Sequence, residues 1–206
     1  MYFLEETILL PGEKIRRIRG YLGLKQSQIT GGRVTRNLIS YIENGKVKLV
    51  RETAEIITEN ILKHASEKNM PIEITAEYLM WDEKEQAKHL LERYLLDLKD
   101  NIHRDKRFNM GLERAKEILE FWEIRNKKAE LDEVLGDYLY EKKEFIKGNI
   151  YYIKAIENYI KERNNLKVAE VYVKLGNNKI LMKDYQEGIY YNDHAKLLLY
   201  ENGIED

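Results

Sequence analysis

Arg36 and Asn37 are adjacent side chains whose hydrogen-bonding groups suit the edges of base pairs. An arginine guanidinium can donate two parallel hydrogen bonds to guanine, and an asparagine amide can pair in a similar way with adenine. Thr35 precedes them, and its hydroxyl can cap the first turn of a helix. The sequence predicts that this helix covers residues 36–44 and ends at Gly45.

Charge is unevenly distributed along the 206 residues. Residues 12–68 contain 12 Lys and Arg against 6 Asp and Glu, whereas residues 69–206 contain 23 against 28. The net charge of the whole chain is -1, so the basic block is visible only when the segments are compared. A basic block favours contact with a polyanion, and we expect the first third of the chain to make that contact.

Short helices are predicted to position Arg36 and Asn37. Residues 14–22 carry an apolar stripe at helical spacing, and residues 24–29 are long enough for only one or two helical turns. A turn with Gly31 and Gly32 follows, since paired glycines adopt left-handed dihedrals without steric cost. Another helical stripe, over residues 49–68, closes the bundle. The order of short helix, glycine turn and short helix is typical of a helix-turn-helix.

Two strings in this segment resemble the Cro/repressor-type (XRE) DNA-binding domain. They are Leu24-x-Gln26-x-x-Ile29 and Val34-Thr35-x-x-x-Ile39-Ser40-x-Ile42-Glu43-x-Gly45-Lys46. The resemblance covers residues 12–68, within a predicted domain 1–68, and implies that the helix over 36–44 lies in the major groove of double-stranded DNA. It implies base or phosphate contacts from nine residues: Gln26, Arg33, Thr35, Arg36, Asn37, Ser40, Tyr41, Lys46 and Lys48.

A basic, solvated helical bundle is the alternative interpretation of the same residues, with Arg36 and Asn37 as ordinary surface side chains. In either case Leu38, Ile39 and Ile42 are expected in the core. Glu43 is interpreted as the structural partner of a nearby basic residue rather than as a DNA contact.

The remainder of the chain is predicted to begin with a linker near 69–75, because Pro71 disfavours helix in the residue before it. A single helix is then expected over 75–98. We assign 69–89 to a linker and connecting helix, and 90–206 to a second domain.

Internal repeats define this second domain. Leu135-Gly136 recurs 40 residues on as Leu175-Gly176, and other small and aromatic residues recur at the same interval. The pattern resembles the tetratricopeptide repeat and implies stacked helical hairpins near 90–125, 130–164 and 168–203. The fold class predicted for the chain is therefore all-α, a helix-turn-helix bundle followed by a tetratricopeptide-like solenoid.

Such repeats form a concave surface from their first helices, where polar side chains suit the backbone amides of an extended peptide. The alternative for any one of these side chains is ordinary contact with water. The residues expected to face this groove are Arg93, Tyr94, Asp97, Asn101, Asp137, Tyr140, Asn177 and Ile180.

The combination of the two domains resembles the peptide-responsive regulators of Gram-positive bacteria, the Rap/Rgg/NprR/PlcR/PrgX group. It implies a homodimeric transcription regulator whose repeats bind a short signalling peptide, as in quorum sensing. One alternative is a phage- or plasmid-like repressor whose repeats only dimerise. Another is a repeat-built adaptor that binds a protein partner.

Other classes of function have little support in the sequence. The chain has no cysteine, which excludes a disulfide scaffold and a thiolate metal site. Its four histidines are scattered without metal-ligand spacing, and no serine stands in a nucleophile elbow. We therefore expect no enzyme activity, metal or cofactor. No apolar run approaches the ~18 residues of a membrane span, and the first ten residues lack a basic residue, so we expect a cytoplasmic protein without a signal peptide.

Overall fold

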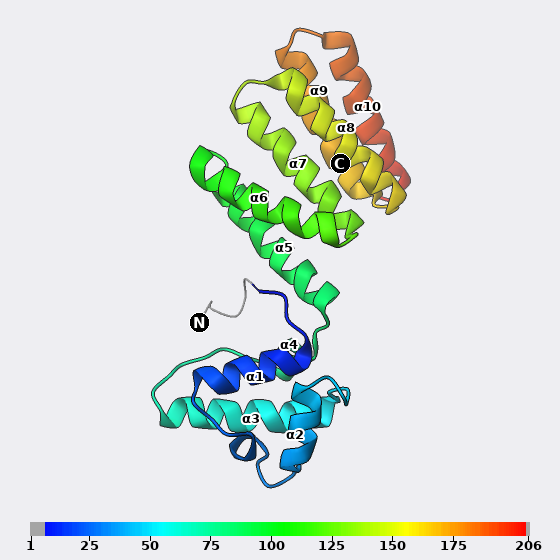
Figure 1. Ribbon diagram of the computed structural model, residues 1–206. Helices are drawn as coiled ribbons and strands as arrows, with labels where there is room; N and C mark the ends of the chain where they lie inside the picture. The colour runs from blue at the N-terminus through cyan, green and yellow to red at the C-terminus, as the bar shows by residue number, and fades with distance from the viewer. Residues whose placement is uncertain (1–6, 205–206) are drawn as a thin grey trace. The chain divides into compact units, whose positions relative to one another are not determined.

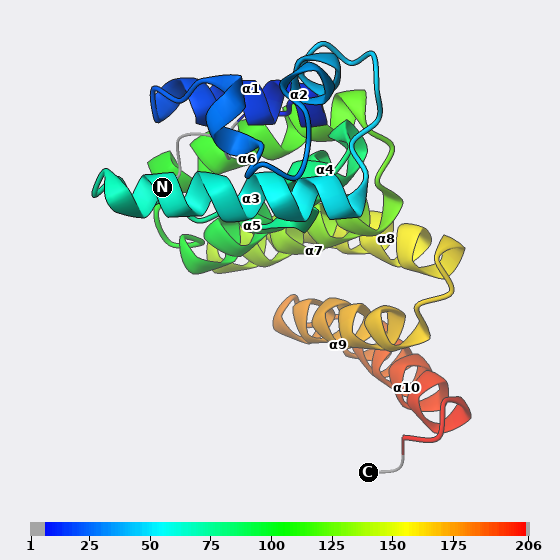
Figure 2. The same ribbon diagram turned by 90° about the horizontal axis from the view of Figure 1, so that it is seen from below.

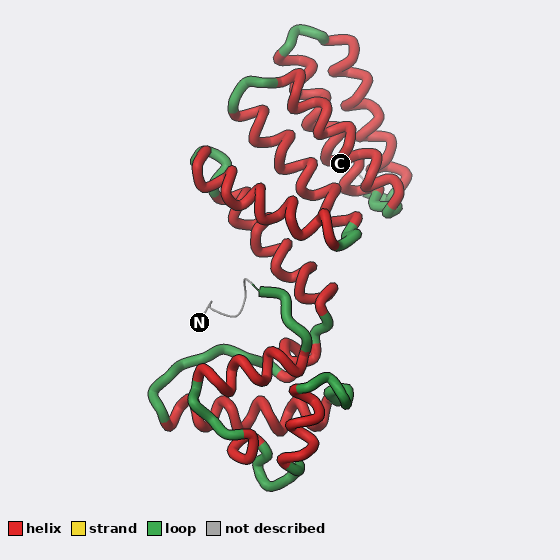
Figure 3. The backbone as a smooth tube through the Cα atoms, in the orientation of Figure 1, coloured by secondary structure: helices red, strands yellow, loops and turns green. Residues whose placement is uncertain are grey.

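The computed structural model describes residues 7–204, and within this range it contains helices and no strand (Figures 1 and 3). The all-α fold class predicted from the sequence is confirmed. The chain divides into two compact units, Met1–Leu90 (unit 1) and Leu91–Asp206 (unit 2). Each unit has its own buried apolar core, so each is described separately.

Unit 1 is a bundle of short helices around one aliphatic core. Its elements are α1 (Pro11–Tyr21), the 3-10 helix η2 (Gln26–Ile29), α2 (Arg36–Glu43), α3 (Arg51–Glu67) and α4 (Ala76–Met80). The core is built from the apolar stripes of these helices. Its fully buried members are Ile15, Ile29, Ile39, Ala54, Ile57, Ile61 and Leu79.

Helices α1 and α2 approach each other closely at Gly12. A Cβ atom at this position would lie 2.1 Å from the carbonyl oxygen of Ile42, so only glycine fits. At the end of α2, Gly45 has φ of 67° and its N–H donates to the Ile42 carbonyl at 3.0 Å. A glycine tolerates this left-handed conformation, which ends the helix as the sequence predicts.

Residues 70–80, part of the segment assigned to a linker and connecting helix, belong to the core of unit 1. Leu79 is fully buried, and Met70, Ile72 and Ile74 pack against the same cluster. The prediction of one helix over 75–98 is wrong, because the chain leaves the helical conformation at Trp81. The Asp82 carboxylate accepts a hydrogen bond from the Glu85 N–H at 2.8 Å and caps a new helix, α5 (Glu83–Asp100).

Unit 2 continues from α5 with five helices of equal length, each of 17 residues and each beginning 20 residues after the previous one. They are α6 (Asp105–Phe121), α7 (Arg125–Glu141), α8 (Phe145–Lys161), α9 (Asn165–Leu181) and α10 (Tyr185–Glu201). The 40-residue interval in the sequence is therefore two helices and two turns. Figures 1 and 2 show α9 and α10 as neighbouring antiparallel helices.

Small residues allow the helices of each hairpin to pack closely. A Cβ at Gly136 of α7 would meet the Tyr152 ring of α8 at 2.3 Å, and one at Gly176 of α9 would meet the Gly188 carbonyl of α10 at 2.9 Å. The observed hairpins cover 125–161 and 165–201, whereas the predicted units began near 130 and 168. The repeated glycines lie inside the helices. Their spacing therefore predicts the length of the repeat, but it does not locate the residue at which each helix begins.

Candidate nucleic-acid interface

Helix α2 is held on the bundle by one face and presents the other to solvent. Ile39 and Ile42 are buried in the core, while Arg36 and Asn37 are exposed in the first turn. The Thr35 hydroxyl oxygen accepts a hydrogen bond from the Leu38 N–H at 3.1 Å, as the cap requires. The side chains of Arg36 and Asn37 have no hydrogen-bonded or ion-paired partner among residues 7–204. Their donors are thus available to a ligand.

The other predicted DNA-contacting residues lie around α2 with different degrees of exposure. Tyr41, Lys46 and Lys48 are exposed, and Ser40 is half-buried one turn after Arg36. Arg33 is also exposed, but its guanidinium forms an ion pair with Glu59 of α3. A phosphate contact from Arg33 would have to compete with that carboxylate.

Glu43, at the end of α2, is the structural partner that the sequence predicts. The residue is 4% exposed, and its carboxylate accepts hydrogen bonds from Arg19 Nε at 2.8 Å and Nη2 at 3.1 Å. Burial alone raises the pKa of Glu43, but hydrogen bonds from Arg19 and Gln26 and the charges of Arg19 and Arg16 outweigh burial and lower it. Glu43 therefore ties α1 and η2 to α2.

Gln26 has an internal partner that the resemblance did not imply. Its Nε2 donates to the Glu43 carboxylate at 3.0 Å, and the side chain is half-buried. The amide thus positions η2 against the C-terminal end of α2. One amide N–H is committed inside the protein, so at most part of this side chain remains for a DNA phosphate.

A buried joint between α1 and the α4–α5 segment is absent from the sequence prediction. Lys14 is fully buried, and its Nζ donates to the carbonyls of Tyr78 at 2.7 Å and Trp81 at 2.6 Å. Burial lowers the pKa of Lys14 to about 8, against an opposing effect of the Asp82 charge. The Gln86 amide pairs with both the N–H and the carbonyl of Leu9. Within unit 1, Lys14 and Gln86 therefore hold the segment from α4 to the start of α5 against α1 and Leu9.

The groove residues predicted on α5 and in the turn after it have contacts within unit 2. Asp97 accepts a hydrogen bond from Arg107 of α6 at 2.5 Å, and buried Asn101 donates to Asp97. The Arg93 guanidinium lies 5.9 Å from the centre of the Tyr94 ring. Asp97 and Asn101 therefore stabilise the α5–α6 turn rather than forming an open polar surface.

On α7 and α9 the predicted groove residues differ in accessibility. Asp137 accepts from Tyr152 at 2.8 Å and from Lys174 at 2.7 Å. Tyr140, Asn177 and Ile180 are exposed or nearly half exposed. Asp137 is therefore occupied by contacts within unit 2. The side chains of Tyr140 and Asn177 form no hydrogen bond or ion pair among the described residues, and Ile180 is an exposed apolar side chain.

Next to Asp137 lies a buried carboxylate that the sequence pattern did not reveal. Glu133 of α7 is 6% exposed and accepts hydrogen bonds from Lys174 of α9 at 2.7 Å and from Tyr159 of α8 at 2.8 Å. Burial raises the pKa of Glu133, but the charge and hydrogen bond of Lys174 and the hydroxyl of Tyr159 reverse the effect and lower it. This network joins three successive helices.

No family model, curated protein or solved structure matches the chain. Within residues 7–204, no group of three or more His, Asp or Glu side chains is arranged to hold a metal ion. In the same range, no helix combines the length and apolarity that crossing a bilayer requires.

Proposed function

We propose that this protein is a sequence-specific DNA-binding regulator of transcription, with α2 as its recognition helix. The observation that carries the proposal is the two-sided nature of α2: Ile39 and Ile42 anchor one face, and Arg36 and Asn37 offer unpartnered donors on the other. Eight residues of helix span about 12 Å, which fits the width of the B-DNA major groove.

Phosphate contacts on either side of the groove would set the register of α2. Lys46 and Lys48 follow α2 directly and are exposed, so they are the proposed contacts on that side. Such contacts raise affinity for any duplex and carry no sequence information. Base contacts from Arg36 and Asn37 would supply the preference.

A gel-shift titration with operator and scrambled duplexes, after selection of the operator from a random library, tests this division of roles. We expect Arg36→Ala to bring operator affinity down by about tenfold or more, with little change on scrambled DNA. Lys48→Ala should weaken both duplexes alike. Lys63→Ala, an exposed lysine on α3, is the matched control for charge and should leave both unchanged. Equal binding of the two duplexes by the unaltered protein would overturn the base-reading role of α2, and binding of neither would favour a protein-binding adaptor.

For unit 2 we propose the role of effector domain, with a short signalling peptide as the effector. Tyr140, Asn177 and Ile180 are accessible side chains on the first helices of adjacent hairpins, which supports a peptide lying across α7 and α9. Calorimetric titration with short peptides from culture medium tests the role. Saturable binding that Asn177→Ala weakens would support it, and no binding would favour the second candidate.

The second candidate is a repressor whose repeats only dimerise. A specific observation favours it: α8 is buried on one side against α7 and carries exposed Ile146, Ile150, Ile153 and Ile160 on another. A helix that is apolar on most of its circumference is ordinarily covered. Light scattering at micromolar concentration distinguishes the candidates, because a dimer that Ile150→Glu dissociates, with no peptide binding, supports this one.

A further inference from the structure

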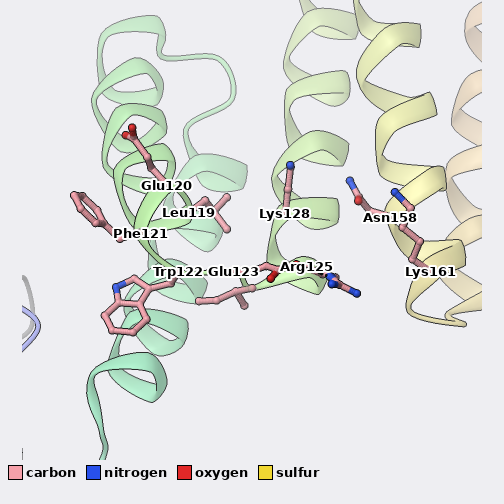
Figure 4. A pocket seen from close by; sticks show the side chains of 10 residues that line it. Leu119, Glu120, Phe121, Trp122, Glu123, Arg125, Lys128, Asn158 and Lys161 are labelled. Atoms are coloured by element: carbon pink, nitrogen blue, oxygen red, sulfur yellow. Dashed lines mark hydrogen bonds and ion pairs between the residues drawn. The ribbon is translucent and has the colours of Figure 1, made fainter.

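A pocket of about 590 Å³ lies in unit 2 where α6 ends, α7 begins and α8 ends (Figure 4). One wall is formed by Leu119, Glu120 and half-buried Trp122, and the other by polar side chains of α7 and α8. Figure 4 shows the 122–125 turn joining the two walls. The residues on the second wall are Arg125, Lys128, Asn158 and Lys161.

Two ammonium groups on this wall are available for a ligand. Lys128 and Lys161 have no hydrogen-bonded or ion-paired partner among the described residues, whereas Arg125 is paired with Glu123 at 2.8 Å. The positive charge of Lys128 also acts on the Asp132 carboxylate, one turn later in α7, without a hydrogen bond or ion pair between them. Once the Arg125–Glu123 pair is discounted, the second wall carries two ammonium groups that form no ion pair among the described residues.

The position of Lys128 is not explained by helix stability. It stands in the first turn of α7, which contains no acidic residue, and a cation there opposes the positive end of the helix dipole. Lys127 beside it is accounted for by ion pairs to Glu92 and Glu130. A residue that opposes the helix dipole and forms no ion pair points to a role toward a ligand.

The repeat itself shows that these polar residues are not required for the hairpin. Forty residues on, Lys128 and Asn158 correspond to Val168 and Leu198. Val168 is 2% exposed in the apolar cluster of α8 and α9, and Leu198 packs against that cluster. The remaining two cationic positions are replaced as well, Arg125 by Asn165 and Lys161 by Glu201. The α9–α10 hairpin therefore has apolar packing at the positions where the α7–α8 hairpin has an open, positively charged pocket.

We infer that this pocket binds a small organic anion. Its carboxylate or phosphate lies between Lys128 and Lys161, and its apolar body lies against Leu119 and Trp122. Ammonium groups bind either anion as compact charges, and the indole and leucine surfaces gain from covering an apolar group. The site lies within unit 2 and its test needs no DNA. A negative result for anion binding therefore leaves the proposed DNA binding untouched, and the reverse also holds.

Fluorescence of Trp122 in the full chain carrying Trp81→Phe reports the site directly, since the chain has two tryptophans. The probes are N-acetylphenylalanine, phenyl phosphate, the uncharged N-acetylphenylalaninamide and inorganic phosphate. We expect saturable changes with the first two and at least tenfold weaker binding of the amide. The tighter of the two anions indicates whether the natural ligand carries carboxylate or phosphate.

Substitutions separate the two lysines from general charge. Lys128→Ala with Lys161→Ala should weaken both anionic probes at least tenfold. Lys116→Ala with Lys147→Ala removes the same charge from exposed positions outside the pocket and should have little effect. Binding that is equal for acid and amide, or unchanged in the first double variant, would overturn the inference. Inorganic phosphate that binds as tightly as phenyl phosphate would overturn the role of the apolar wall.

Discussion

Units 1 and 2 join their helices by different means. In unit 1 the contacts that supplement the apolar core differ from one pair of elements to the next: Gly12 admits the Ile42 carbonyl, Lys14 binds the carbonyls that end α4, and Glu43 holds Arg19. The helices α1 to α4 range from 5 to 17 residues. Single side chains therefore specify this unit, and substitution of one of them is expected to damage the whole bundle.

In unit 2 the contacts follow the repeat. A glycine on the first helix of a hairpin meets the second helix at Gly136 and again at Gly176, 40 residues on. The turns after α7, α8 and α9 all place a residue in the left-handed region at the same position. Because the design is repeated, each contact contributes a smaller share, and damage should stay local.

The largest expected difference is between Gly12 of unit 1 and Gly148 of unit 2. Gly12→Ala places a Cβ 2.1 Å from a backbone oxygen, which cannot rotate away, so we expect a loss of about 3 kcal/mol, the upper part of the range for overpacking. Gly148→Ala of α8 meets its nearest atom at 3.3 Å and should cost about 1 kcal/mol. Urea unfolding followed by Trp81 for unit 1 and Trp122 for unit 2, in single-tryptophan chains, measures both. Equal losses would contradict the contrast.

The buried carboxylates give a second, smaller difference. Glu43→Gln removes the negative charge beside the Arg19 guanidinium and one of the two oxygens that accept from it, so a loss of about 3 kcal/mol is expected in unit 1. After Glu133→Gln, Lys174 still has Asp137 at 2.7 Å, and the loss in unit 2 should be nearer 1–2 kcal/mol.

Acid unfolding provides the control for these carboxylates. Both native pKa values are lowered, so each ionised group stabilises its unit above the unfolded pKa of about 4.3, and that stability disappears as pH falls through the native value. Each glutamine variant should therefore flatten the acid limb of its own unit only. A flattened limb in the other unit would show that the two carboxylates do not act locally.

The difference between the units also determines what the sequence could predict. The helical order of residues 12–68, the Thr35 cap and the stop at Gly45 could be predicted, because each depends on neighbours in sequence. The partner role of Glu43 could be predicted from the basic residues of this segment, although Arg19 itself lies 24 residues away in the sequence. The joint formed by Lys14 and Gln86 could not, since its partners are 64 to 77 residues away and include backbone groups. A buried lysine such as Lys14, which donates to backbone carbonyls, produces no recognisable pattern in the spacing of residues.

In unit 2 the 40-residue interval predicted the stacked hairpins, but not the polar roles within them. Asp97 and Asp137 were assigned to a groove by register, and the structure pairs them with Arg107 and Lys174. Helical register gives the side of a helix and not the long side chains that reach it from a neighbour. The pocket beside Lys128 was missed for a related reason, because it depends on which residue replaces Val168 in the earlier copy.

An effect of pH that belongs to unit 1 alone follows from Lys14. Its native pKa of about 8 lies below the value of about 10.4 in unfolded chains, so the unfolded state binds the proton more tightly. The free energy of unfolding should therefore rise as pH increases from about 8 to about 10, and Trp81 fluorescence in urea measures it. Lys14→Met should abolish this rise. A similar rise at Trp122 would assign it to another group.

The smallest effects are expected at the repeated turns of unit 2. Lys143, Arg163 and Lys183 have φ of 59°, 55° and 66°, and each N–H closes the turn on the carbonyl three residues earlier. Gly203 follows α10 in the same conformation and needs no substitution. Because a side chain is strained there and glycine is not, Lys143→Gly should stabilise unit 2 by about 0.5–1 kcal/mol, despite the greater freedom of the unfolded chain. The variant with glycine at all three positions should gain roughly the sum of the three single effects, because the turns lie apart. Lys142 precedes Lys143 and has a right-handed conformation, so Lys142→Gly should lower the stability of unit 2. A gain at Lys142→Gly, or a loss at all three turns, would show that the left-handed residues are not what limits this unit.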